Sequence, residues 1–178
     1  LKKTIEELKS ADAVDQEALS KAETALKEAE SKIFTPIIGC EMYVADNDMT
    51  DRSNKKDIGR HLIVLAKNQH GYHNLIKLVS NAWTDGYYYH PRTDKKQLEK
   101  YHEDLIVCSA CLGGEVPKLI TAGHVEEAEK SILWFKKVFG EDYYLELQRH
   151  KATVARANQE AYPLQQEVNK VLIEMSKK

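Results

Sequence analysis

The apolar positions of the chain follow two different patterns, and the change falls near residue 33. Residues 1–33 contain no glycine, no proline and no aromatic residue. We expect two helices in this segment. Asp12 is the expected N-cap of the second helix, and Asp15 adds negative charge near the positive end of that helix. The apolar residues recur at helical spacing at Leu1, Ile5 and Leu8, and then at Leu19, Leu26 and Ile33. The pattern predicts an antiparallel helical hairpin. Both a partner-binding coiled coil and a solvated insertion are compatible with it, and the short stripe favours the insertion.

From residue 34 onward, near-continuous apolar runs alternate with helical patterns. Four runs have the character of strands buried on both faces: 35–45, 60–68, 104–111 and 143–150. Amphipathic stretches between and after them predict helices at 71–83 and 94–101, on both sides of Gly123, and within 158–178. Strand and helix alternate four times, which predicts an α/β fold with a parallel or mostly parallel sheet.

Composition narrows the class of protein. Of the 178 residues, 42% are hydrophobic and 30% are charged, as in ordinary soluble globular proteins. The formal net charge of −2 argues against a protein that coats nucleic acid through an overall basic surface. Three cysteines do not form the framework of a secreted disulfide scaffold, so we expect a reducing, cytoplasmic location. No apolar run reaches the roughly 18 to 20 residues that span a bilayer, and no signal-peptide core begins the chain.

Polar residues that suit a functional site lie in or beside the predicted strands. Folds of this class place their chemistry at the carboxyl ends of strands. Glu41 lies within an apolar strand, where an ionised carboxylate is costly unless it is paired or bound to metal. His61 opens the strand HLIVLA, Cys111 ends LIVCSAC, and His150 ends the fourth strand. The pattern suggests a metal or acid–base site, although each residue taken alone also suits a structural role.

The stretch DLIVCSACLGGEV contains Cys108 and Cys111 in a C-x-x-C spacing, which is typical of redox pairs and of half a zinc site. A thioredoxin-like pair begins a helix, whereas both of these cysteines trail a strand. A structural zinc site needs a second pair of ligands. The sequence has no second C-x-x-C, and its H-x-x-H, His70 and His73, lies in a polar helical segment where we expect both histidines to face solvent. We therefore expect Cys108 to be a small core residue and Cys111 to be the thiol with a different exposure.

The run GYYYHPR interleaves aromatic residues with basic ones. Tyr88, His90 and Arg92 suit contacts with nucleic acid, because aromatic rings stack on bases and arginine binds phosphate. The alternative is a surface loop whose tyrosines pack on the domain and keep their hydroxyl groups in water.

Several of these segments, taken together and in order, resemble one known family. GCEMYVA, RHLIVLAKNQHGYHNLIKLVSNAW, GYYYHPR, LIVCSACLGGEV and YYLELQRH are similar to the N-terminal PHP (polymerase and histidinol phosphatase) domain of the alpha subunit of bacterial DNA polymerase III. The resemblance runs from about Phe34 to the C-terminus. It implies that 34–178 are part of a PHP domain and that 1–33 are a helical hairpin inserted before it.

The resemblance implies a (β/α)7 barrel of which this chain supplies about four strands, with a metal centre at the carboxyl ends of the strands. Glu41, His61 and Cys111 match three of the ligand positions of the family, and zinc or another divalent metal is the implied cofactor. The centre would support 3′-5′ exonuclease or phosphoesterase chemistry. The alternative is a non-catalytic scaffold that docks a proofreading subunit and stabilises the polymerase.

The sequence departs from the family pattern in its ligand set. It has no H-x-H, no D-H and no D-x-H motif, so we expect an internal piece of the domain that is inactive alone. The implied parent is a DNA-directed DNA polymerase that uses DNA, deoxynucleoside triphosphates and magnesium. Its implied partners are a proofreading exonuclease subunit, a sliding clamp and other replicase subunits, with no membrane contact. A free-standing PHP-type phosphoesterase is a further option. Unpaired strand edges predict self-association of the chain.

Overall fold

The computed structural model describes residues 1–10, 15–32, 34, 36–154 and 160–177. The chain divides into two compact units, Leu1–Pro36 and Ile37–Lys178. We describe each unit by itself.

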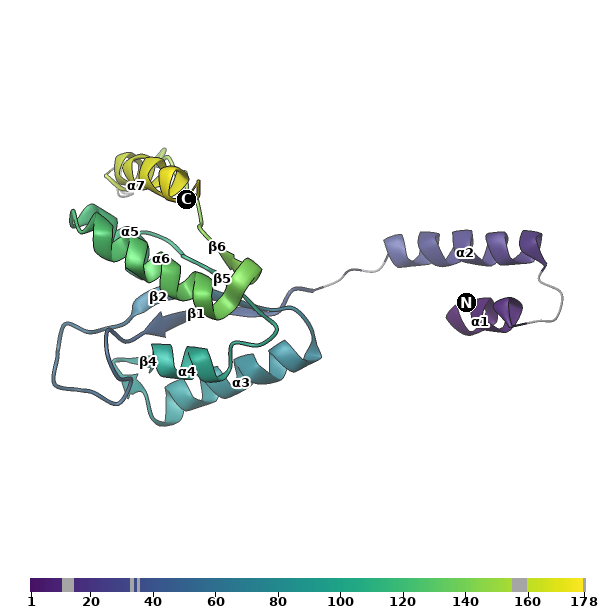
Figure 1. The fold of residues 1–178 in the computed structure, drawn as a ribbon, viewed down its shortest axis with the longest axis horizontal. Coiled ribbons are helices and arrows are strands. Elements are labelled where there is room, and N and C mark those ends of the chain that lie inside the picture. The colour runs from purple at the N-terminus through teal and green to yellow at the C-terminus, as the bar shows by residue number, and fades with distance from the viewer. Residues whose placement is uncertain (11–14, 33, 35, 155–159, 178) are drawn as a thin grey trace. The chain divides into compact units, whose positions relative to one another are not determined.

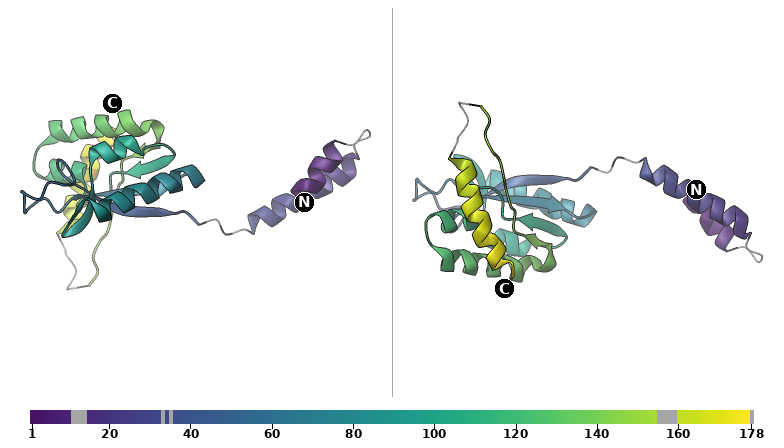
Figure 2. Two further views of the ribbon diagram at one scale, coloured as in Figure 1. Left: turned by 90° about the horizontal axis from the view of Figure 1, so that it is seen from below. Right: turned by 90° about the horizontal axis from the view of Figure 1, so that it is seen from above.

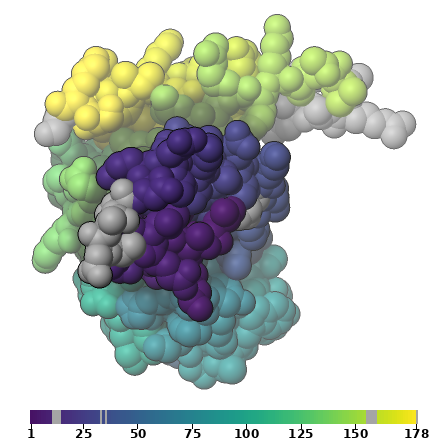
Figure 3. Space-filling view, turned by 90° about the vertical axis from the view of Figure 1, so that its right-hand side faces the viewer, coloured from purple at the N-terminus to yellow at the C-terminus, as the bar shows by residue number. Residues whose placement is uncertain are grey.

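The first unit is a pair of helices, α1 (Lys2–Lys9) and α2 (Gln16–Ser31). The helix α2 begins after Asp15, whose carboxylate accepts hydrogen bonds from the backbone amides of Glu17 and Ala18. Asp15 is therefore the N-cap, whereas Asp12 lies outside the described residues. Salt bridges of 3.0 and 2.8 Å join Lys2 to Glu30 and Lys9 to Glu23 across the pair. In the space-filling view the two purple helices form one continuous body (Figure 3). Whether the hairpin is an insertion stays a prediction.

The second unit is built on a six-stranded sheet with the order β3-β4-β1-β2-β5-β6. The strands are β1 (Gly39–Val44), β2 (Arg60–Ala66), β3 (Tyr87–Tyr88), β4 (His90–Thr93), β5 (Leu105–Cys108) and β6 (Tyr143–Tyr144). The pairs β1/β2, β2/β5 and β3/β4 are antiparallel, and the pairs β1/β4 and β5/β6 are parallel. Within the described residues β3 and β6 end the order at opposite edges, so the sheet is open.

The expectation of a parallel or mostly parallel sheet was wrong, and the connections explain why. A parallel pair needs a crossover, usually through a helix. Residues 45–59, which join β1 to β2, form no helix and turn the chain back beside itself. Two further expectations need correction. The predicted strand 143–150 is regular only at Tyr143–Tyr144, and GYYYHPR is not a loop, because it contributes the short β3/β4 hairpin.

The helices agree better with the sequence pattern. They are α3 (Gln69–Thr84), α4 (Lys95–Lys100), α5 (Glu115–Thr121), α6 (Val125–Phe139) and α7 (Ala161–Met175), with a 3₁₀ turn at Gly140–Asp142. Asn68 and Asp94 cap α3 and α4 through their side chains, as short polar residues do at helix starts. Gly123 separates α5 from α6 with a φ of +82°, a conformation that glycine adopts at little cost. No helix in the described part of the chain is long and apolar enough to cross a membrane.

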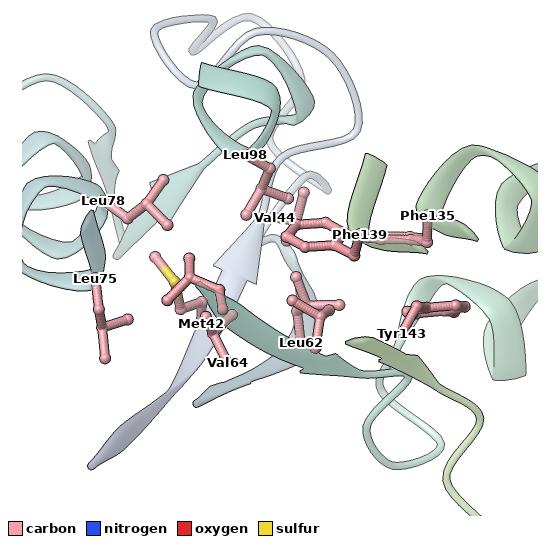
Figure 4. Close-up of a cluster of buried hydrophobic side chains, with 12 residues drawn as sticks. Met42, Val44, Leu62, Val64, Leu75, Leu78, Leu98, Phe135, Phe139 and Tyr143 are labelled. Atoms are coloured by element: carbon pink, nitrogen blue, oxygen red, sulfur yellow. The ribbon is translucent and has the colours of Figure 1, made fainter. Parts of the chain in front are cut away.

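One face of the sheet forms the main core (Figure 4). Met42 and Val44 of β1 lie beside Leu62 and Val64 of β2 on this face, because side chains alternate along a strand. Helices α3, α4 and α6 cover it, as the ribbon view shows (Figure 1). The covering side chains are Leu75, Leu78, Leu98, Phe135 and Phe139. The alternation sends the intervening residues of β1 and β2 to the opposite face.

A second apolar cluster joins α5, α6 and α7. Its buried members are Val116, Ile120, Ala128, Val168 and Leu172. The helix α7 also lies along the extended segment 145–150 (Figure 2), where the Asn169 side chain donates a hydrogen bond to the carbonyl of Gln148 at 2.8 Å. This packing holds the segment that follows β6 against the rest of the unit.

Candidate metal centre

Glu41 and His61 meet on the face of the sheet opposite the main core. In the antiparallel pair, Tyr43 lies opposite His61 and Glu41 lies one diagonal step away. His61 Nδ1 is 2.9 Å from Glu41 Oε1. The side chain of Glu41 is 50% exposed and that of His61 is 29% exposed, so both are reachable from solvent.

The turn after β5 brings Cys111 to the same place. Ala110 has a φ of +60°, a left-handed conformation that reverses the chain directly before the cysteine. The backbone amide of His61 donates to the carbonyl of Gly113 at 3.1 Å, which fastens the turn to β2. Cys111 Sγ lies 3.3 Å from His61 Nδ1 and accepts a hydrogen bond from the Gly113 amide at 3.3 Å. A thiolate at this position therefore has a backbone donor that stabilises its charge.

Gly113 leaves room for the imidazole ring. A Cβ atom at this position would lie 2.8 Å from His61 Nδ1 and 3.0 Å from two ring carbons, closer than real Cβ contacts. Any larger residue would press on the ring. Gly113 of the CLGG stretch thus allows the His61 ring to lie close to the turn.

The three side chains offer donor atoms that suit one divalent ion. One atom each from Glu41, His61 and Cys111 lies within 4.8 Å of the other two. Neighbouring ligands of a tetrahedral zinc ion are about 3.3 to 3.8 Å apart, as bond lengths of about 2.0 to 2.3 Å require. The observed separations, 2.9 Å from His61 Nδ1 to Glu41 Oε1 and 3.3 Å from His61 Nδ1 to Cys111 Sγ, need to open by about half an ångström or less. Carboxylate oxygen, imidazole nitrogen and thiolate sulfur are the usual donors to zinc.

Aromatic rings border the three donors on one side. The ring of Tyr43 meets the His61 ring edge-on with 5.0 Å between centroids, and it stacks on the His90 ring at 4.7 Å and 5°. Tyr43 was not among the residues predicted from the sequence, although its place two residues after Glu41 puts it on the same face of β1. These contacts restrict the orientation of the imidazole.

Cys108 differs from the expectation of a core residue. It is half-buried and pairs with Ile63, which places it on the same side of the sheet as His61, while the adjacent Val107 is the residue in the main core. Burial, and then the charge of Glu146, raises the pKa of its thiol. All three cysteines are free thiols. The strand ends at Cys108, so the alternation of side chains cannot be extended to Cys111.

Arg92 has a structural place that the sequence did not reveal. Its side chain is fully buried and forms a salt bridge with Asp57 at 3.3 Å. The guanidinium also donates to the carbonyls of Met49, Asp51 and Asp57 at 3.0, 2.7 and 3.0 Å. The expected phosphate contact by Arg92 therefore needs correction, because these partners occupy the guanidinium inside the protein.

The other predicted nucleic-acid residues lie nearby. Tyr88 is half-buried with its ring over the Arg92 guanidinium at 5.1 Å, and His90 stacks on Tyr43. A contact of Tyr88 or His90 with nucleic acid stays a prediction. His150 is not one of the three converging donors, and it lies outside the strands. Its amide donates to Gln165 of α7 at 2.7 Å.

Fold and site together define an α/β domain with a candidate divalent-metal centre on the face of its sheet opposite the main core. The chain belongs to the PHP domain family, whose model matches residues 6–150. The matched range begins inside α1, so the family model also covers most of the helical hairpin.

Several relatives of the chain carry the name DNA polymerase III subunit alpha. The DNA polymerase III subunit alpha of Borreliella burgdorferi is 55% identical over 129 residues, which are 70% of this chain and 11% of the relative. The protein of the same name from Treponema pallidum is 48% identical over 118 residues, 64% of this chain and 10% of the relative. That of Chlamydia pneumoniae is 38% identical over 165 residues, 85% of this chain and 13% of the relative. The chain thus spans about a tenth of the length of these relatives.

Proposed function

We propose that this chain is part of the PHP domain of a replicative DNA polymerase of the DNA polymerase III alpha type. The identity of 38 to 55% to three proteins of that name, over 64 to 85% of the chain, supports the proposal. The parent would extend a primer by nucleotidyl transfer from deoxynucleoside triphosphates with magnesium. Its partners would be DNA, a proofreading exonuclease subunit, a sliding clamp and other replicase subunits. The free thiols suit a reducing, cytoplasmic location.

We also propose an architecture for the intact domain. The open sheet would be part of a (β/α)7 barrel, with residues 34–178 in the domain and residues 1–33 as an inserted hairpin. The division of the described chain after Pro36 supports a boundary near that position. Further strands would pair with the free edges of the sheet.

Glu41, His61 and Cys111 would hold zinc or another divalent ion, and the observation that carries this proposal is the convergence of their donor atoms within 4.8 Å. A bound divalent ion supplies activation of water and stabilisation of charge on a phosphoryl group. Nδ1 of His61 faces both other donors, and only an unprotonated Nδ1 can act as a ligand. The Gly113 amide and the Tyr43 ring hold the thiolate and the imidazole in place.

The reaction class that suits this centre is hydrolysis of a phosphodiester, as in 3′-5′ exonuclease proofreading. Glu41 is half exposed, which leaves the centre open to a polymeric substrate from the face opposite the main core. Three donors leave coordination positions free, and the resemblance assigns further ligands to motifs absent from this sequence. We therefore expect the chain alone to hydrolyse phosphodiesters weakly at most. The assembled donors favour a metal centre over the purely structural scaffold.

Metal content tests the proposal directly. The chain would be dialysed against zinc or manganese, and bound metal would be measured by plasma mass spectrometry. We expect near-stoichiometric metal that is lost in Glu41→Gln, His61→Ala and Cys111→Ser. Cys108→Ser is the matched control, because it removes a half-buried thiol on the same side of the sheet and outside the three donors. Equal metal content in Cys111→Ser and in the wild type would overturn the assignment.

A further inference from the structure

Glu146 lies beside the stretch that carries Cys111. It follows β6 in the extended segment 145–150, along which α7 lies (Figure 2), and it is half-buried. The backbone amide of Glu146 donates to the hydroxyl oxygen of Ser109 at 2.8 Å, and the amide of Ser109 donates to the carbonyl of Tyr144 at 3.0 Å. Ser109 is buried and stands between the two cysteines of the C-x-x-C stretch. The segment that carries Glu146 is therefore fastened to the stretch that ends at Cys111.

The Glu146 carboxylate lies on the side of the sheet that carries the candidate metal centre. Burial raises the pKa of the Cys108 thiol first, and the charge of Glu146 raises it further, so the two groups are close. Cys108 pairs with Ile63, which is two residues after His61 on β2 and therefore on the same face. Cys108 also pairs with Tyr144, two residues before Glu146. The carboxylate thus faces away from the main core.

Amide side chains hold the carboxylate and its segment in place. Gln148 Nε2 donates to Glu146 Oε1 at 2.6 Å. On α7, Gln165 Oε1 accepts from the His150 amide at 2.7 Å. Asn169 Nδ2 donates to the carbonyl of Gln148 at 2.8 Å. The side chains of α7 in this group are buried, and a buried amide is costly unless it is hydrogen-bonded, so these bonds fix the position of the segment.

A small polar cavity lies between Glu146 and Cys111. Its volume is about 10 Å³, which is close to the space that a single water molecule needs. The polar side chains that line it beside Cys111 are Glu146, Gln148, Gln165 and Asn169. Among the described residues Gln148 is the one side chain that donates to Glu146, and it uses Oε1, so Oε2 remains for a further donor. The cavity therefore suits one ordered water molecule with several polar partners.

We propose that Glu146 positions the thiolate of Cys111 through one water molecule in this cavity. The water would donate one hydrogen to Glu146 Oε2 and the other to Cys111 Sγ, and it would accept a hydrogen bond from a side-chain amide of α7. The thiolate would then have two donors, this water and the Gly113 amide at 3.3 Å. Glu146 is a positioning residue and not a ligand, because its oxygens are not among the described donor atoms that converge within 4.8 Å. The inference deepens the proposed function and rests on it, since Cys111 is a ligand only if the metal centre forms.

Zinc affinity, measured by competition with a chromophoric chelator, tests this role. We expect Glu146→Ala to weaken zinc binding about tenfold, as the loss of a group that orients a ligand does. Glu146→Gln keeps an oxygen that can accept from water, so it should restore most of the affinity. Leu147→Ala is the matched control, because it truncates a 48% exposed neighbour in the same segment that does not line the cavity. An equal loss in Leu147→Ala, or no restoration in Glu146→Gln, would overturn the hydrogen-bonding role of Glu146.

The absorption of bound Co²⁺ gives a readout that a purely structural role would not move. A hydrogen bond to a thiolate ligand stabilises the sulfur lone pair and raises the energy of thiolate-to-cobalt charge transfer. Glu146→Ala should therefore shift this band to longer wavelength, whereas Leu147→Ala should leave it in place. A band that stays in place in Glu146→Ala with Co²⁺ bound would overturn the inference.

A high-resolution crystal structure of the chain without added metal separates this inference from the proposed centre. We expect a water molecule within hydrogen-bond distance of both Glu146 and Cys111. A dry or closed cavity would overturn the water bridge, while zinc that is lost in Cys111→Ser would still uphold the proposed centre. A wild-type chain that binds no zinc would overturn the proposed centre and, with it, the positioning role of Glu146.

Discussion

The guanidinium of Arg92 and the carboxylate of Asp57 form an ion pair of 3.3 Å inside the protein, where Arg92 is 0% exposed and Asp57 is 6% exposed. Asp57 also accepts hydrogen bonds from the amides of Asp46 and Gly59, at 3.1 and 3.2 Å. The pair thus fastens the loop 45–59, which joins the two strands that carry Glu41 and His61. A buried ion pair with further hydrogen bonds determines the path of this loop.

Removal of one partner should be costly. We expect Arg92→Leu to lower the free energy of unfolding by about 3 to 5 kcal/mol, because it leaves Asp57 charged and buried without its partner. Urea denaturation followed by circular dichroism measures the change. Arg60→Leu is the control, since its pair with Asp46 at 2.8 Å is about a third exposed on both sides and should contribute less than about 1 kcal/mol. Equal losses in the two variants would contradict the structural role of Arg92.

The sequence predicted the elements with strong periodicity and missed what depends on distant contacts. The long helix at 69–84 and the strand at 60–66 follow from local apolar spacing. The direction of β1 against β2 does not, because it depends on how residues 45–59 fold. Arg92 looked like a surface cation, since nothing local shows that Asp57, 35 residues earlier, is its buried partner.

The candidate site was also predictable only in part. Glu41, His61 and Cys111 were found through motifs, whereas their meeting depends on the β1/β2 register and on the turn after β5. Ala110 gives no sequence signal for its left-handed conformation, because alanine rarely adopts it. The role of Gly113 becomes clear only once its contact with the His61 ring is known.

Tyr143 should be replaceable by phenylalanine with a gain in stability. Its hydroxyl group is buried and has no hydrogen-bond partner among the described residues. The ring stacks on Phe135 at 5.0 Å, a contact that phenylalanine retains. We expect Tyr143→Phe to raise the free energy of unfolding by about 1 kcal/mol, since an unpaired buried polar group is costly. Thermal or urea denaturation measures the change, and Tyr144→Phe at the exposed neighbour should have little effect.

Tyr143 should also contribute to the decline in the free energy of unfolding at alkaline pH. Burial, helped by the charges of Glu115 and Cys108, raises the pKa of the Tyr143 phenol far above its usual range. The unfolded chain ionises this tyrosine near pH 10, while the folded chain keeps it neutral. Its contribution to stability is therefore complete below about pH 10 and is lost as the pH rises above that value. Tyr143→Phe should flatten the decline, and an unchanged decline would exclude Tyr143 as its cause.

Self-association is expected on the side of the unit where β6 ends the sheet. Leu133 of α6 is 62% exposed and lies with Leu145 and Met175 along an apolar groove between α6 and α7. An edge strand beside exposed apolar side chains favours pairing with a second copy. Sedimentation velocity should show a concentration-dependent increase in mass that Leu133→Lys reduces. Ile76→Lys, at a 43% exposed position on α3, should leave the association intact.

Gly113 should control metal affinity without being a ligand. An added Cβ would lie 2.8 Å from His61 Nδ1, so Gly113→Ala must displace either the ring or the turn that carries Cys111. We expect zinc affinity to fall by about tenfold or more, in line with the effect of residues that orient ligands. Competition with a chromophoric chelator measures the affinity. Gly123→Ala is the comparison, because its φ of +82° gives it a backbone cost of its own while a Cβ there meets open space. If Gly113→Ala loses stability like Gly123→Ala but binds zinc like the wild type, the three donors do not depend on the close approach of the turn. A selective loss of zinc would show that the glycine holds the imidazole in its ligating position.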